Sequence, residues 1–221
     1  MTTSGTTVEL LMERYGRTHA EEAGIALRDT PAPLYRLLVL CVLFSVRIKA
    51  DIAVAAAREL SGAGLLTPQA MSASPWQLRV DALGRAHYRR YDETTATALG
   101  AGARFVLDRY RGDLRRLREE AGGEPRRVRE LLREVPRIGP VGADIYCREA
   151  QGVWPELRPS FDRRARDAAG DLGLPRTPEA LARLVPADDL PKLAAALVRA
   201  GLAKVTSADE LRAGRPEGAA P

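Results

Sequence analysis

Residues Val135–Ala143 read Val-Pro-Arg-Ile-Gly-Pro-Val-Gly-Ala and carry the most structural information in the chain. Helical sequence precedes this stretch from Arg126 to Val135 and follows it from Gly142 to Ala150, so we predict two helices joined by a short turn. The N–H groups of such a turn, and of the first turn of the second helix, are unpaired within the helix. They point together at one place, where the helix dipole adds partial positive charge.

Two interpretations of this hairpin are open on the local pattern alone. In the first, Gly139 and Gly142 keep the turn free of Cβ atoms, so that a phosphate oxygen can approach the backbone. In the second, the hairpin is an ordinary pair of helices, and Gly serves only to make the turn tight.

The rest of the chain also has a helical pattern, with no run of alternating apolar and polar residues long enough to be a strand. Val8–Ala26 predicts an amphipathic helix, and Asp92–Arg109 predicts a long one. Leu34–Phe44 is apolar on all sides, so we expect it at the centre of the core. Short helices are predicted after the hairpin. The fold class expected is all-α.

Composition and length are those of a soluble globular protein. The 221 residues are 45% hydrophobic and 29% charged, and a chain of this length buries about 70% of the surface that its unfolded form exposes. The longest apolar run, Leu37–Phe44, has eight residues, whereas a membrane span needs about 20. The N-terminus, Met1–Thr7, lacks the apolar region of a secretory signal. We therefore expect a cytoplasmic protein without a membrane partner, and a monomer.

Charge and cysteine content restrict the possible ligands. The net charge of +5 fits a polyanionic partner. However, 31 of the 34 basic residues are Arg, a skew typical of GC-rich codon usage, so charge alone favours nucleic acid only weakly. Cys41 and Cys147 are too few and too far apart in sequence for a zinc or iron–sulfur site, and His87 has no second ligand near it in sequence. No metal and no cofactor are expected.

The hairpin resembles the helix-hairpin-helix of the endonuclease III-like DNA glycosylase superfamily (HhH-GPD). That motif usually reads Leu-Pro-Gly-Val-Gly-Arg-Lys-Thr-Ala. Pro136, Gly139 and Ala143 match it, and Val135 and Ile138 are apolar residues of similar size.

Further segments resemble the same superfamily in the same order. Leu38–Ser45 is similar to a buried helix ahead of a polar turn, and Leu83-Gly84 with Tyr91 is similar to the sequence before the long helix. Trp154-Pro155 and Phe161-Asp162 are similar to the Trp-Pro stretch and the catalytic Asp of the family. The resemblance covers roughly residues 34–170.

The resemblance implies a DNA glycosylase-like fold with two helical subdomains. The expected division is a helical bundle of residues 31–135 and a second subdomain of residues 8–30 plus 136–212, which holds the hairpin and Asp162. Residues 213–221 are small, polar and end in proline, so a disordered tail is expected there.

The departures from the family indicate which kind of member this would be. Val141 occupies the position of the lysine that forms a Schiff base with the sugar in bifunctional members, so lysine-dependent AP lyase activity is not expected. Arg137 replaces the first hairpin glycine, either straining the turn or adding a phosphate contact. Pro140 removes one N–H donor, and the four-cysteine iron–sulfur loop is missing.

The implied function is that of a monofunctional DNA glycosylase in base excision repair, which hydrolyses the N-glycosidic bond of a damaged or mismatched base in double-stranded DNA. Asp162 would stabilise positive charge on the sugar and orient a water. Its alternative role is to cap the helix that follows, although Ser160 could cap that helix instead. The alternative function is a non-catalytic DNA-binding protein that uses the hairpin for backbone contacts. The residues implied for DNA binding are Arg47, Arg137, Gly139, Val141, Gly142 and Arg163.

Overall fold

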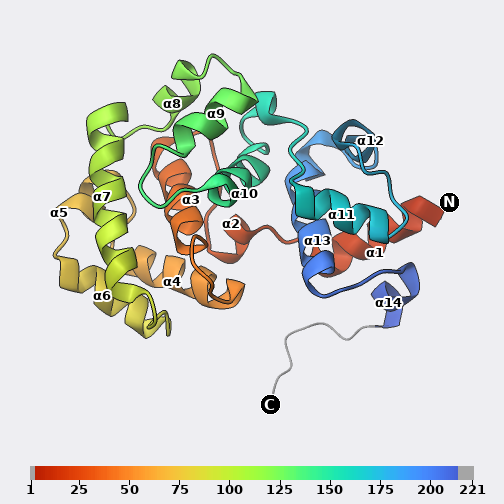
Figure 1. Ribbon diagram of the computed structural model, residues 1–221, viewed down its shortest axis with the longest axis horizontal. Coiled ribbons are helices and arrows are strands. Elements are labelled where there is room, and N and C mark those ends of the chain that lie inside the picture. The colour runs from red at the N-terminus through yellow and green to blue at the C-terminus, as the bar shows by residue number, and fades with distance from the viewer. Residues whose placement is uncertain (1–2, 214–221) are drawn as a thin grey trace. The chain divides into compact units, whose positions relative to one another are not determined.

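The computed structural model describes residues 3–213, and within that range the chain is helical without a strand (Figure 1). The expected tail, residues 213–221, lies outside the described residues apart from Ala213, which ends the last helix. The elements in chain order are α1 (Thr3–Tyr15), α2 (His19–Glu22), α3 (Pro31–Leu43), α4 (Ala50–Gly62), α5 (Pro68–Ala73), α6 (Trp76–Arg85), α7 (Asp92–Tyr110), α8 (Arg115–Glu120), α9 (Pro125–Leu132), α10 (Pro140–Ala150), η1 (Pro155–Leu157), α11 (Arg163–Asp171), α12 (Pro178–Ala182), η2 (Ala187–Asp189), α13 (Leu190–Leu202) and α14 (Ala208–Ala213).

The chain forms two compact units. The central unit is His19–Leu157, and the terminal unit consists of the residues up to Thr18 and from Arg158 onward. This differs from the expected division, because residues 19–30 and 136–157 belong to the central unit. The physical reason is burial: the apolar side chains of α2 and α10 lie in the same core as those of α3.

The core of the central unit is built around α3. Every residue of this helix from Leu34 to Leu43 is buried except Arg36, which confirms the expectation for this segment. A helix that is apolar on all sides needs neighbours on all sides, and α3 packs against α4, α7 and α10 (Figure 1). Each buried leucine side chain contributes about 1.5–3 kcal/mol through removal from water.

The terminal unit has its own core, in which α13 packs against α1 and α11. Small residues allow the close approach of α11 and α13. A Cβ atom at Gly201 would lie 3.0 Å from the Cβ of Ala168. Asp162, the catalytic residue expected from the sequence, immediately precedes α11.

The prediction of one helix over Val8–Ala26 is wrong, because the structure has two helices with a break between them. A Cβ atom at Gly16 would lie 2.2 Å from the carbonyl oxygen of Met12, so this bend requires glycine. The second helix begins with support from a distant residue. The buried carboxylate of Glu149, on α10, accepts hydrogen bonds from the backbone N–H groups of His19 (3.3 Å) and Ala20 (3.0 Å).

Glu149 therefore fastens the second helix of the hairpin to α2. We predict that Glu149→Gln lowers the free energy of unfolding by about 2–3 kcal/mol, because a buried amide cannot accept both N–H bonds through its two ends. Urea unfolding of the full chain measures the loss. Glu119→Gln, at an exposed position on α8, is the control and should have almost no effect. Equal stability of the two variants would contradict this role of Glu149.

Candidate nucleic-acid interface

The hairpin between α9 and α10 contains a tight turn over Val135–Ile138. The N–H of Ile138 donates to the carbonyl of Val135 at 3.0 Å, and Pro136 and Arg137 are the two central residues. Arg137 has a φ of 72°. A proline at the second position and a residue with left-handed backbone at the third position are the features of a type II turn. The third position of such a turn is normally glycine.

Arg137 is thus a non-glycine residue in a conformation that favours glycine. Among residues 3–213, the other non-glycine residues with positive φ are His87, Arg111 and Lys204. Each of these three follows the end of a helix, where a left-handed residue is common. Arg137 does not, and its backbone strain costs about 1–2 kcal/mol relative to glycine. Its side chain is exposed.

The backbone donors at the start of α10 are open. The first bond of this helix runs from the N–H of Ala143 to the carbonyl of Gly139 at 3.0 Å. In the part of the chain that the structure describes, no hydrogen bond uses the N–H of Gly139, Val141 or Gly142. A Cβ atom at Gly139 would have nothing within 4 Å, so the space beside this residue is open, whereas Gly142 is buried.

Val141 projects from the hairpin into solvent, with 60% of its surface exposed. The side chain carries no group that could act as a nucleophile. The two arms of the hairpin are joined by an ion pair between Arg129 Nε on α9 and Asp144 Oδ1 on α10, at 3.1 Å. Asp144 is therefore engaged in holding the hairpin together.

The hairpin lies against the end of α3. A Cβ atom at Gly142 would lie 3.7 Å from the carbonyl oxygen of Cys41, which belongs to the last turn of α3. Ile138 and Ala143 are buried in the core that surrounds α3. The start of α10 and the C-terminal end of α3 are therefore neighbours.

The turn that follows α3, Phe44–Lys49, adds positive charge at that end. Its side chains alternate in burial. Phe44, Val46 and Ile48 are partly buried and pack against the core, whereas Ser45, Arg47 and Lys49 are exposed. We call this segment the basic turn. Arg47 was expected here from the sequence, whereas Lys49 was not.

Asp162 lies in the terminal unit, as the N-cap of α11. Its Oδ1 accepts a hydrogen bond from the N–H of Ala165 at 3.0 Å, and the side chain is half-buried. Of the two capping residues that the sequence allowed, the structure uses Asp162, and Ser160 is buried. Arg163 follows in the first turn of α11. Its side chain is 88% exposed and pairs with Asp167 at 3.5 Å.

The expected residues thus fall into two groups. The central unit brings Arg47, Arg137 and the three backbone donors to one end of α3, and the terminal unit holds Asp162 and Arg163 side by side in sequence. The described residues contain no group of three or more His, Cys, Asp or Glu side chains placed to hold a metal ion. In the same residues no helix is long and apolar enough to cross a membrane.

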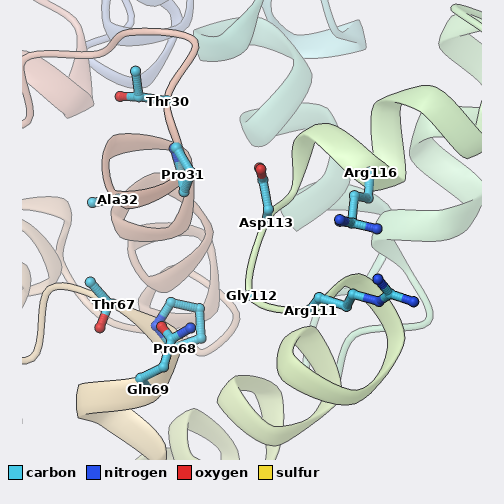
Figure 2. Close-up of a pocket in the computed structure, with 10 residues that line it drawn as sticks. All are labelled: Thr30, Pro31, Ala32, Thr67, Pro68, Gln69, Arg111, Gly112, Asp113 and Arg116. Atoms are coloured by element: carbon cyan, nitrogen blue, oxygen red, sulfur yellow. The ribbon is translucent and has the colours of Figure 1, made fainter.

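The opposite end of α3 borders a hollow of about 480 Å³ (Figure 2). The carboxylate of Asp113 on its wall is bound by Arg115 at 2.7–3.0 Å, which lowers the pKa of Asp113. The side chain of Arg111 extends away from the proline-lined wall (Figure 2). This hollow therefore does not direct charge at one point, and it lies away from the hairpin. The lining residues are Thr30, Pro31, Ala32, Thr67, Pro68, Gln69, Arg111, Gly112, Asp113 and Arg116.

Comparison with known proteins relates this arrangement to one fold. The sequence matches no family model and no curated protein. The solved structures that are similar to the chain include a trapped covalent intermediate of endonuclease III with DNA (estranged-adenine complex), with a TM-score of 0.50, and a non-covalent endonuclease III–DNA complex, with a TM-score of 0.54. Each is 16% identical, and each comparison covers 90% of this chain and 86% of the other. The all-α chain therefore has the helical DNA glycosylase fold of endonuclease III, as the hairpin and the segments around it predicted.

Proposed function

We propose that this protein is a DNA repair protein that acts as a monofunctional DNA glycosylase on double-stranded DNA. The fold supports the proposal, because solved structures with a similar fold are complexes of endonuclease III with DNA. The open hairpin donors beside two exposed arginines, Arg47 and Arg137, support binding to a phosphate backbone.

The observation that carries the proposal is the strained Arg137 beside these donors. A glycine at this position would relieve the backbone strain, yet the chain has a long cationic side chain there. Strain of this kind is a reasonable sign of function when it occurs at a site that can bind a ligand. An arginine next to N–H groups that have no acceptor among the described residues combines a full positive charge with directional hydrogen bonds, which suits a phosphate.

The chemistry is assigned to Asp162. Hydrolysis of an N-glycosidic bond builds positive charge on the sugar, and a carboxylate stabilises that charge and orients the attacking water. The target base must first leave the duplex stack. The cap that Asp162 forms with Ala165 fixes the orientation of its carboxyl group, and a fixed orientation is what such a role requires.

The proposed reaction ends at base release. Val141 has no amine, so no Schiff base with the sugar can form at the position where bifunctional members carry their lysine. The product is then an intact strand with an abasic site.

The first test measures base release from a panel of damaged and mismatched duplexes. Asp162→Asn keeps a side chain that caps helices well but removes the charge, so the rate should fall by about 10²-fold or more while stability is kept. Asp171→Asn, on the exposed face of α11, is the matched control and should retain full activity. Undiminished release by Asp162→Asn would remove the assigned role. Duplex binding without release from any substrate would favour the non-catalytic alternative.

Arg137→Gly separates stability from binding. This variant should raise the free energy of unfolding by about 1 kcal/mol because the strain disappears. It should also weaken duplex binding and reduce the salt dependence of log Kd by about one counterion.

Arg111→Gly provides the control for this variant, because Arg111 is also exposed with a positive φ (53°) but lies at the far end of α3. It should be stabilised similarly and bind DNA as the wild type does. Fluorescence anisotropy over a salt series measures binding. Equal weakening by the two substitutions would show that Arg137 contributes only to net charge.

Borohydride trapping tests the absence of a lysine-dependent step. The wild type is expected to give no covalent adduct with an abasic duplex, whereas Val141→Lys is expected to give one, since it places an amine at the hairpin. Denaturing gels resolve the adduct. A wild-type adduct that forms as readily as that of the variant would exclude the monofunctional assignment.

A further inference from the structure

We infer that Tyr88 is a positioning residue that holds the basic turn in place for contact with DNA. The inference rests on the proposed function, because it assigns a role in DNA binding to a residue that DNA itself cannot reach. Tyr88 has no exposed surface. Its influence must therefore pass through the residues that it contacts.

The end of α6 directs Tyr88 inward. The N–H of Tyr88 donates to the carbonyl of Leu83, and that of His87 to the carbonyl of Gly84, both at 3.0 Å. His87, between the helix and Tyr88, is left-handed with a φ of 59°. These two bonds and the left-handed residue form a Schellman motif, which ends the helix and reverses the chain.

The phenol of Tyr88 then reaches the end of α3. Its hydroxyl donates to the carbonyl oxygen of Leu43 at 2.8 Å, and the bond is buried. Leu43 is the last residue of α3, so its carbonyl has no partner within the helix. Burial raises the pKa of Tyr88, against the opposing effects of a hydrogen bond with Thr95 and of the Arg137 charge. The hydroxyl therefore remains a donor at neutral pH.

Tyr88 consequently lies where three elements meet. Leu43 precedes the basic turn directly, Thr95 belongs to the start of α7, and Arg137 belongs to the hairpin and lies close enough for its charge to influence the phenol. The basic turn and the hairpin are the two parts of the central unit to which DNA contacts are assigned. The buried hydroxyl of Tyr88 is bonded to the residue that precedes the basic turn.

The basic turn has little other backbone support. In the described part of the chain, the backbone bonds of its residues are Ser45 N–H to Val42 O (3.0 Å), Ile48 N–H to Val46 O (2.9 Å) and Ala53 N–H to Lys49 O (3.2 Å), besides those of Phe44 that end α3. None involves the N–H of Arg47. Loss of the Tyr88 hydroxyl would leave the Leu43 carbonyl buried without a partner, and the segment would shift to hydrate it.

Tyr88→Phe tests this role, with Tyr110→Phe as a matched control. Tyr110 is equally buried in the central unit, but its hydroxyl has no hydrogen-bond partner among the described residues. We expect Tyr88→Phe to weaken duplex binding about five- to tenfold and to reduce the salt dependence of log Kd by about one counterion. Tyr110→Phe should bind with unchanged affinity and salt dependence.

A double variant distinguishes positioning from general destabilisation. If Tyr88 acts through Arg47, then adding Tyr88→Phe to Arg47→Ala should change the affinity for the duplex less than about twofold, because the contact between Arg47 and DNA is already lost. Additive losses would overturn the inference. So would wild-type affinity and salt dependence in Tyr88→Phe.

Amide hydrogen exchange gives a second readout that needs no DNA. The amides of residues 44–49 should exchange faster in Tyr88→Phe than in the wild type, while those of α7 stay protected and Tyr110→Phe shows no change.

A wild type that binds no duplex would refute the proposed function and the DNA role of Tyr88 with it. Binding weakened by Arg47→Ala, but with unchanged exchange and affinity in Tyr88→Phe, would refute the inference alone.

Discussion

The central unit depends on the burial of α3. This helix has no continuous polar face, so it is stable only when other helices surround it. The need to cover it brings together α4, α7 and α10, which are far apart in the sequence. Because α10 is also the second helix of the hairpin, the same burial places the hairpin at the C-terminal end of α3. The position of the proposed DNA-binding surface is thus a consequence of core packing.

Several features could be predicted from the sequence because their signals are local. Helical periodicity predicted the all-α class and the long helix α7. The uninterrupted apolar run identified α3 as part of the core, and the pattern of Pro and Gly residues identified the hairpin. The bend at Gly16 also had a local signal, but the amphipathic pattern on both sides of it masked the break. The start of α2 at His19 depends on Glu149, a residue that is distant in sequence.

Other features depend on contacts that the sequence does not reveal. Whether residues 136–157 belong with α3 or with the terminal helices is decided by which apolar faces meet. Ser160 and Asp162 were equivalent capping residues in the sequence, and the geometry of α11 selected Asp162. Tyr88 is one of six tyrosines, and only its bond to Leu43 distinguishes it from the others that are buried.

The exposed Val141 has a consequence for the thermodynamics of binding. A duplex lying on the hairpin would cover this side chain and remove apolar surface from water, with a negative change in heat capacity and little dependence on ionic strength. A lysine at the same position would instead contribute by counterion release, which salt suppresses. Under the proposed function, Val141 would therefore give the protein a share of affinity that persists in concentrated salt.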